Sequence, residues 1–171
     1  VHADWAEAFD PRTFDGSERA FGDYVILGQI SRGGMGIIYK ARQRSLDRIV
    51  AMKVMASSEA STSETRASFQ REARAVARLR HPHVVATHAL DRLGDVDFFT
   101  MDYVEGLPLQ RAIASEGLSQ REIVGVFVKL CDAVEYAHSQ GILHRDLTPR
   151  NILLGRKHSP VLIDFGISTS I

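Results

Sequence analysis

The stretch YVILGQISRGGMGIIYKA, residues 24–41, places glycines at positions 33, 34 and 36 between two runs of strand-forming residues. These glycines allow backbone N–H groups to approach an anion, because no side chains intervene. A dinucleotide-binding loop or a Walker-type loop must instead run into a helix whose N-terminus holds the phosphate, and the segment IIYKA is too β-branched and aromatic to open one. The stretch therefore predicts a glycine-rich β-hairpin, which either covers a phosphate group or carries no ligand.

The residues that follow this hairpin continue with strand-like and helical patterns. RIVAMKVM, residues 48–55, supplies a third strand, so an antiparallel meander is expected. Ser61 and Glu64 form a capping-box pattern ahead of a helix that we expect to extend through Leu79. Two further strands are expected, at residues 84–90 and 98–104.

The second half of the chain turns helical after Gly106. A short helix is expected at residues 109–115 and a long amphipathic one at residues 119–140. The apolar face of the long helix is expected to carry Ile123, Phe127, Leu130, Val134 and Ala137. Cys131 on this helix is interpreted as a buried small apolar residue. Two short apolar strands, NILL and VLID, follow and are joined by a turn at residues 155–160.

The order of the elements, mostly β and then mostly α, predicts an α+β fold with two lobes and a boundary near Glu105. Residues 1–20 are interpreted as an N-terminal arm or linker, since the aromatic residues there follow no period. Residues 21–105 form the expected first lobe and residues 106–171 part of a second. Both ends look cut, because there is no initiator methionine and the sequence stops directly after a strand-like run. The chain is therefore interpreted as a fragment.

Composition and charge narrow the functional classes. The 171 residues are 44% hydrophobic and 25% charged, which is typical of a globular protein with a real core. Lys plus Arg and Asp plus Glu number 21 each, so the bulk charge predicts neither nucleic acid nor an anionic membrane as a partner. Cys131 is the single cysteine, which favours a reducing compartment and hence the cytoplasm. The longest apolar runs fall far short of the roughly 18 residues that a bilayer-spanning helix needs.

Two charged residues lie in apolar patterns. Lys53 falls in the middle of IVAMKVM, and Glu72 falls within the apolar stripe of the following helix, three residues after Phe69. Burying either charge alone would cost several kcal/mol, whereas each can offset the other if the helix packs on the sheet. The pattern indicates a Lys53–Glu72 ion pair. The alternative is that both side chains reach solvent at the edge of the interface.

Acidic and amide residues lie in the loops of the second half. Asp146 and Asn151 bracket a loop within HRDLTPRN, residues 144–151, and Asp164 closes the strand VLID. Their hard oxygen atoms suit Mg²⁺ that is held partly by substrate phosphates. Taken singly, Asp164 is more simply a turn residue and Asp146 a solvated surface acid.

Together these segments resemble the protein kinase family, specifically the bacterial serine/threonine kinases of eukaryotic type. The resemblance covers about residues 21–168 and rests on six ordered motifs: SRGGMGIIYKA, VAMK, Glu72 in its helix, MDYVEG, HRDLTPRN and DFG. It implies a bilobal kinase-like fold that is truncated after DFG. It also implies transfer of the γ-phosphoryl group of ATP to a Ser or Thr hydroxyl of a protein substrate in bacterial signalling, with Mg²⁺ as cofactor.

The resemblance implies a role for each matching position. Lys53, held by Glu72, would contact the α- and β-phosphates, and Asp146 would accept the proton of the substrate hydroxyl. Asn151 and Asp164 would bind Mg²⁺. The residues implied around the nucleotide are Ile30, Ser31, Gly33, Gly34, Gly36, Ile38, Ala51, Met101, Asp102, Val104 and Leu153. In that set the glycines would cover the phosphates, Met101 would be the gatekeeper, and the backbone of Asp102 and Val104 would meet the adenine edge.

Two positions depart from the family pattern. Ser31 stands where the first loop glycine is usual, and its Cβ restricts the backbone. Thr148 replaces a lysine whose ammonium neutralises charge on the transferring phosphoryl group. Arg150, four residues after Asp146, is the candidate for the missing cation, as in many receptor tyrosine kinases. The alternative is that Arg150 is a solvent-facing loop cation.

Two other functional classes stay open. A pseudokinase would bind nucleotide and regulate without phosphoryl transfer, as Ser31 and Thr148 suggest. The residues that argue against it are the intact Lys53, Asp146, Asn151 and Asp164. A nucleotide-independent interaction module would need none of these charges. The activation segment and the later helices of a kinase are absent after residue 171, so the apolar side of the helix at 119–140 is expected to face water. A membrane anchor is possible only outside this segment.

Overall fold

The computed structural model describes residues 16–33, 36–55, 63–115 and 117–165. The chain divides into two compact units. The first comprises the described residues up to Ala73 together with Thr87–Tyr103, and the second comprises Arg74–Ala86 and the described residues from Val104. The expectation of an N-terminal arm falls largely on residues 1–15, and Ser61 of the capping-box pattern also lies outside the described residues.

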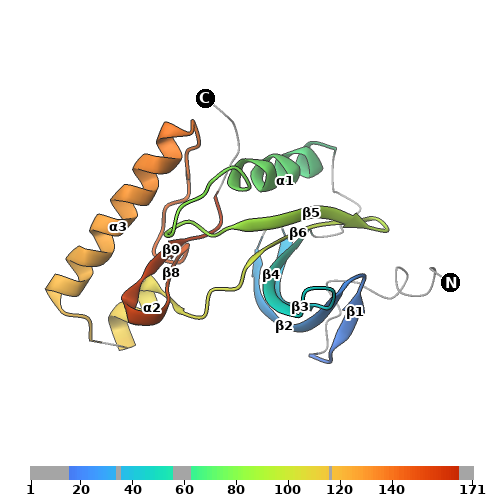
Figure 1. Cartoon of the computed structure of the whole chain (residues 1–171), viewed down its shortest axis with the longest axis horizontal. Coiled ribbons are helices and arrows are strands. Elements are labelled where there is room, and N and C mark those ends of the chain that lie inside the picture. The colour runs from blue at the N-terminus through green and yellow to red at the C-terminus, as the bar shows by residue number, and fades with distance from the viewer. Residues whose placement is uncertain (1–15, 34–35, 56–62, 116, 166–171) are drawn as a thin grey trace. The chain divides into compact units, whose positions relative to one another are not determined.

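The first unit contains a six-stranded antiparallel sheet with the order β1-β2-β3-β4-β6-β5. Figure 1 shows the strong curvature of β2, β3 and β4. The expected meander is confirmed by the antiparallel pairing of β2 with β3, which has two shifts in register, and of β3 with β4. The strands are β1 (Arg19–Phe21), β2 (Tyr24–Gly33), β3 (Gly36–Gln43), β4 (Arg48–Met55), β5 (Thr87–Leu93) and β6 (Val96–Asp102).

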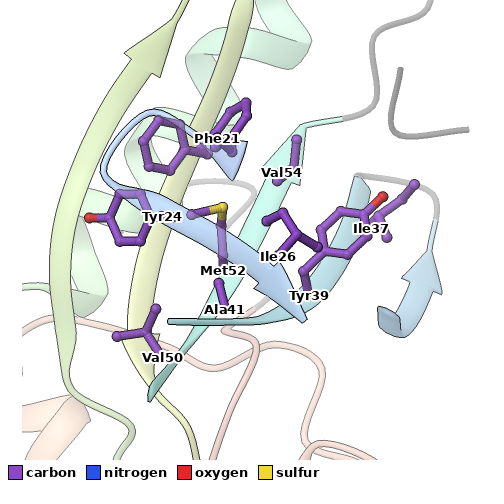
Figure 2. Close-up of a cluster of buried hydrophobic side chains, with 10 residues drawn as sticks. Phe21, Tyr24, Ile26, Ile37, Tyr39, Ala41, Val50, Met52 and Val54 are labelled. Atoms are coloured by element: carbon purple, nitrogen blue, oxygen red, sulfur yellow. The ribbon is translucent and has the colours of Figure 1, made fainter. Parts of the chain in front are cut away.

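One face of this sheet carries the hydrophobic core (Figure 2). Phe98 of β6 packs edge-on against two aromatic rings, with centroid distances of 5.1 Å to Phe21 and 5.7 Å to Tyr24. Because successive strand residues point to opposite faces, the residues between the core positions must lie on the other face. The core residues are Phe21, Tyr24, Ile26, Ile37, Tyr39, Ala41, Val50, Met52, Val54 and Phe98.

Helix α1 (Ser63–Val76) follows β4 in sequence, and its buried side carries Phe69, Glu72, Ala73 and Val76. We expected the helix to extend through Leu79, which is wrong by three residues. The amide of Leu79 donates to the carbonyl of Val76 at 3.0 Å, so the chain leaves the helix through a tight turn with i→i−3 bonds. Leu79 is nevertheless buried.

The last two strands of the sheet are displaced from their expected positions. Residues 84–90 and 98–104 were expected, whereas β5 begins at Thr87 and β6 ends at Asp102. Gly94, with φ of 58°, forms the turn that sets their register. Val84 and Val85 belong to the second unit instead, where Val84 forms a bridge to Leu162 and the Val85 amide donates to its carbonyl at 3.0 Å.

The second unit contains two helices and a small antiparallel sheet with the order β7-β8-β9. The short helix was expected at the observed residues, and the long one is correct to within one residue at each end. Ser119 forms a capping box with Glu122 at its N-terminus. The elements are β7 (Leu107–Pro108), α2 (Leu109–Ser115), α3 (Gln120–Ser139), β8 (Ile152–Leu154), the 3-10 turn η1 (Arg156–His158) and β9 (Pro160–Leu162).

The buried side of α3 differs in part from the expected one. Leu130 and Ala137 are buried as expected, but Val126 and Ala133 complete the buried stripe. Phe127 is 54% exposed, and Cys131 is exposed and not buried as we had interpreted it. A helical period alone cannot choose between two adjacent apolar faces. Val124, Phe127, Val128 and Cys131 therefore form an outward apolar stripe on α3.

No helix among the described residues combines the length and the apolar character needed to cross a bilayer.

Candidate functional site

The glycine-rich stretch forms a β-hairpin. β2 runs to Gly33 and β3 starts at Gly36, and these two glycines are paired across the strands. A strand, not a helix, follows the loop, so a dinucleotide-binding or Walker-type loop is excluded. Ile30, Ser31 and Gly33 are exposed on β2, whereas Gly34 lies outside the described residues.

Gly36 occupies a position that admits no side chain. Its φ is 152°, and a Cβ atom built there would lie 2.1 Å from the carbonyl oxygen of Val54. The close approach of β3 to β4 at this point requires glycine. Gly36 therefore determines the path of the backbone where the hairpin turn enters β3.

The predicted ion pair between Lys53 and Glu72 is present. Lys53 Nζ lies 2.7 Å from Glu72 Oε1, and the two side chains are only 7% and 4% exposed. The alternative, in which both side chains reach solvent, is wrong. Lys53 Nζ also lies 5.8 Å from the ring centroid of Phe99. Because removing one partner leaves a buried uncompensated charge, the pair holds α1 and β4 in a defined relation.

Several predicted site residues share one face of the sheet, opposite the hydrophobic core. Ile38 is the cross-strand partner of Lys53, and Ala51 is the partner of Met101. Core residues alternate with them along each strand, so these side chains point to the face on which α1 packs. The arrangement places a lysine ammonium beside apolar side chains, which suits a ligand with both a planar apolar part and an anionic part.

At the end of β6, Asp102 is exposed and pairs with a histidine that the sequence analysis missed. His88 Nε2 lies 3.0 Å from Asp102 Oδ1. The two residues are brought together because β5 and β6 form a hairpin, which their spacing in the sequence does not reveal. Val104, the next predicted residue, is half-buried and belongs to the second unit.

In the second unit, Asp146 and Asn151 are joined directly. The Asn151 side-chain amide donates to the Asp146 carbonyl at 2.9 Å and to its carboxylate Oδ2 at 2.8 Å. Both bonds use Nδ2, so the Oδ1 oxygen of Asn151 faces away from them and can act as a metal ligand. Asp146 is exposed, which leaves its carboxylate accessible to a substrate.

Ile163 ties the same loop to Asp164. Its amide donates to the Asn151 carbonyl at 2.9 Å, and its carbonyl accepts from His144 Nε2 at 3.0 Å. Both backbone groups of the residue before Asp164 are thus bound by the loop at residues 144–151. These bonds hold Asp164 next to Asn151, although β9 ends at Leu162 and not at Asp164 as expected.

His144 is a buried imidazole in this loop, with a ring centroid 4.4 Å from that of Phe165. Burial lowers the pKa of His144 below its usual value of 6.5, against the opposing effects of the Ile163 hydrogen bond and of Asp146 and Asp164. The ring is therefore neutral near pH 7 and carries its proton on Nε2, the atom that donates to Ile163.

Arg145, which follows His144, and Asp164, which follows Ile163, have left-handed backbone conformations. Arg145 has φ of 60° and Asp164 has φ of 58°. Such conformations cost on the order of 1–2 kcal/mol for residues with a Cβ atom. They persist where surrounding contacts determine the backbone, and they are typical of functional loops.

The other predicted residues of this loop are placed as follows. Thr148 accepts the Asn151 amide through its carbonyl at 3.0 Å and is half-buried, whereas Arg150 is exposed. Leu153 lies in β8, between Pro108 of β7 and Val161 of β9. Asn151 and Asp164 supply two oxygen-bearing side chains, which fits Mg²⁺ because that ion keeps several waters and shares substrate phosphates.

A second ion pair of α1 was also missed by the sequence analysis. Arg66 Nε lies 2.8 Å from Asp97 Oδ2, and the Asp97 side chain is 3% exposed. The period-2 pattern of β6 could have revealed it, because Asp97 falls on the same face as Phe99 and Met101.

Known protein kinase sequences match this chain over most of its length. The family described as "Protein kinase domain" matches residues 24–171. The serine/threonine-protein kinase PrkC of Bacillus subtilis is 36% identical over 155 residues, which cover 90% of this chain and 24% of PrkC. PknF of Mycobacterium tuberculosis, also a serine/threonine-protein kinase, is 37% identical over 155 residues, covering 86% of this chain and 33% of PknF.

Solved structures resemble the fold. The kinase domain of M. tuberculosis PknI matches with a TM-score of 0.73 and 30% identity, covering 91% of this chain and 62% of that one. The apo form of PpkA-294 matches with a TM-score of 0.77 and 27% identity, covering 86% and 59%. The chain thus spans only a quarter to a third of PrkC and PknF and less than two thirds of either structure.

Proposed function

The chain belongs to the protein kinase family, and from this we propose that the protein transfers the γ-phosphoryl group of ATP to a serine or threonine hydroxyl of a protein substrate. The observation that carries the proposal is the buried Lys53–Glu72 ion pair at 2.7 Å, a lysine fixed on the sheet face that also carries Ala51 and Met101. Phosphoryl transfer needs mainly positioning and charge neutralisation from the protein.

In this proposal the first unit binds the nucleotide. Lys53, oriented by Glu72, contacts the α- and β-phosphates, and Gly33, Gly34 and Gly36 allow the hairpin backbone to approach them. Ile38, Ala51 and Leu153 pack on the adenine ring, with Met101 as gatekeeper. Ile30 and Ser31 contribute from β2 just before the glycines, and backbone groups of Asp102 and Val104 bind the adenine edge.

The second unit supplies the groups for the reaction itself. Asp146 orients the substrate hydroxyl and accepts its proton, since its carboxylate is exposed and Asn151 holds it by a hydrogen bond of 2.8 Å. Asn151 and Asp164 hold Mg²⁺ through their side-chain oxygens. When bound, the ion neutralises charge on the phosphates.

Phosphate transfer in the full-length protein tests the function. We expect transfer from radiolabelled ATP to Ser or Thr, and Asp146→Asn to lower kcat by about 10²- to 10⁴-fold, the usual contribution of a general base. Lys53→Met should also abolish transfer. A protein that binds a fluorescent ATP analogue with Mg²⁺ but transfers no phosphate would be a pseudokinase. One that binds no nucleotide would refute the proposal.

Arg150 is proposed to supply the positive charge that Thr148 cannot. A guanidinium can stabilise charge on the transferring phosphoryl group, whereas a threonine hydroxyl cannot neutralise it. Arg150→Ala should lower kcat by about 10²-fold, as removal of one transition-state donor does elsewhere. Thr148→Lys in that variant should restore part of the loss. Arg156→Ala, which removes another exposed loop arginine, is the control, and equal turnover of Arg150→Ala and wild type would refute the role.

The remaining assignments follow from the same proposal. Residues 1–20 would form an arm or linker, residues 21–105 the N-lobe, and residues 106–171 part of the C-lobe. The setting is the cytoplasm, where ATP and a reducing environment are available. Phosphoamino-acid analysis of the labelled product distinguishes Ser or Thr from Tyr as the acceptor.

A further inference from the structure

Asp97 is a buried carboxylate that the proposed chemistry does not use. It lies near the start of β6, and its side chain is 3% exposed. Its partner is Arg66, in the first turns of α1, with Nε 2.8 Å from Asp97 Oδ2. Neither atom has an aligned hydrogen bond to any residue that the structure describes. The contact is therefore a charge pair in which the buried Asp97 carboxylate depends on Arg66, whose side chain is 39% exposed, for compensation.

The Arg66–Asp97 pair repeats the Lys53–Glu72 pair at a second point of the same interface. On α1, Arg66, Phe69 and Glu72 follow at three-residue steps and share one side of the helix. On β6, Asp97 and Phe99 share one face. Phe69 packs on Phe99 with ring centroids 5.2 Å apart, and Phe99 is the cross-strand partner of Lys53. Two ion pairs thus flank one aromatic contact.

The separation of the two pairs fixes the orientation of the helix. Arg66 and Glu72 are about 9 Å apart along the axis, at a rise of about 1.5 Å per residue. A single ion pair would leave α1 able to pivot about Glu72. A second pair on another strand restrains that motion, because the buried Asp97 carboxylate is costly to leave without a partner, although the Arg66 side chain is 39% exposed.

We propose that Arg66 and Asp97 are positioning residues for phosphoryl transfer, which hold α1 so that Glu72 keeps Lys53 oriented toward the phosphates. The inference rests on the proposed function, since it assigns the pair an effect on the reaction beyond stability. It predicts that loss of the pair lowers the rate per folded molecule, with kcat affected more strongly than the KM for ATP.

Three variants of the full-length protein test the effect on rate. Arg66→Met keeps much of the side-chain length and removes the charge, and we expect kcat to fall by about 10- to 100-fold, as for small displacements of catalytic groups. Arg66→Lys should restore most of it. Arg42→Met removes an exposed ion pair with Asp47 at the end of β3 and should leave kcat unchanged. If Arg66→Met matches Arg42→Met, the inference is wrong.

A variant of Glu72 separates positioning from plain stability. In the Glu72→Gln background Lys53 is already released, so adding Arg66→Met should change kcat by less than about twofold, the signature of coupled sites. The effect of Arg66→Met on the melting temperature should persist in both backgrounds. An equal loss of kcat in both backgrounds would overturn the inference. Asp97→Asn, which preserves volume, serves as the second variant if Arg66→Met does not fold.

Hydrogen exchange distinguishes this inference from the proposed function. Arg66→Met should speed exchange of the α1 amides, residues 63–76, in the absence of nucleotide, whereas Arg42→Met should not. If the wild-type protein transfers no phosphate but α1 responds in this way, the proposed function fails, whereas the conclusion that the Arg66–Asp97 pair holds α1 stands. If exchange of the α1 amides is unchanged in Arg66→Met, the pair does not hold α1, whether or not the protein transfers phosphate.

Discussion

At the scale of single residues, His144 makes the stability of the second unit depend on pH. Burial lowers its pKa below 6.5, so the folded protein binds a proton there less readily than the unfolded chain does. Its contribution is present in full above pH 6.5 and is lost as the pH falls through that value toward the lower pKa of the folded state. We expect the free energy of unfolding to decrease over this range.

Urea titrations at pH 7.5 and 5.5 measure this loss. His144→Gln should show a smaller difference between the two pH values, because the titrating group is absent. His138→Gln, which removes an exposed histidine of α3, is the control and should behave as wild type. A wild-type difference that persists in full in His144→Gln would refute the assignment.

The Lys53–Glu72 pair separates stability from activity. Glu72→Gln leaves a buried ammonium without its anion, so we expect a loss of about 3–5 kcal/mol in the free energy of unfolding. The double variant Lys53→Met with Glu72→Leu should recover most of that stability, because apolar residues of similar volume often replace a buried ion pair at no cost. It should remain inactive. Denaturant unfolding tests the expected recovery of stability, and phosphate transfer measured on the same samples tests the expected loss of activity.

At the scale of elements, the glycine hairpin depends on Gly36 for its contact with β4. A Cβ atom at this position would lie 2.1 Å from the Val54 carbonyl oxygen, so Gly36→Ala must displace a strand. We expect a loss of about 1–3 kcal/mol, as for other overpacked sites. Gly28→Ala in the same hairpin is the matched control, because no atom lies within 4 Å of its Cβ position. Thermal unfolding should separate the two variants, and equal melting temperatures would contradict the close approach.

Helix α3 depends on its capping box. Ser119 Oγ accepts from the Glu122 amide at 3.3 Å, and the Glu122 carboxylate accepts from the Ser119 amide at 2.9 Å. Ser119→Ala should cost about 1 kcal/mol of stability, the usual value for an N-cap. Ser139→Ala at the exposed C-terminal end should cost less than about 0.5 kcal/mol.

The same cap predicts a response to acid. Hydrogen bonds from Ser119 lower the pKa of Glu122 below its ordinary value of 4.5. Its stabilising effect is present above pH 4.5 and is lost as the pH falls through the lower folded value. The difference in stability between wild type and Ser119→Ala should therefore shrink between pH 5 and pH 3. A constant difference would mean that the Glu122 carboxylate does not take part in the cap.

An element was predictable from the sequence where neighbouring residues determine it, and not where it depends on contacts with distant segments. The meander of β2, β3 and β4 and the ends of α3 were predictable from strand patterns, turn residues and the Ser119 cap. The apolar run at Val84 and Val85 was read as part of a strand because nothing local shows that these residues pair with Leu162. Phe127 was placed on the wrong side of α3 because the helix is apolar on two adjacent faces.

The candidate site shows the same division. Lys53 and Glu72 were predictable as partners because a charge within an apolar run needs compensation. The period-2 pattern of β6 places Asp97 on the same face as Phe99, but it does not identify Arg66 as the partner of Asp97. The His88–Asp102 pair was not predictable, since His88 meets Asp102 only through the β5–β6 hairpin. The bonds of Ile163 to His144 and Asn151 use backbone atoms, which leave no trace in a pattern of residue types.

At the scale of the whole molecule, a ligand that binds the folded protein raises its melting temperature. We expect ATP with Mg²⁺ to stabilise the full-length protein by about 2.7 kcal/mol at a concentration 100-fold above Kd. Removing Mg²⁺ with EDTA, or introducing Asp164→Asn, should reduce the shift because the phosphates lose a shared cation. Differential scanning fluorimetry measures it, and a shift that is equal with and without Mg²⁺ would contradict the metal-binding role of Asp164.

The apolar stripe on α3 governs how these 171 residues behave when purified alone. Val124, Phe127 and Val128 are each more than half exposed, and Phe127 and Val128 lie about one turn from Val124 on one side of a 20-residue helix. Such a surface makes molecules adhere to one another, so concentrated stocks will scatter light and lose material on standing. Detergent or a charged residue at position 127 would counter this without touching the groups that handle phosphate.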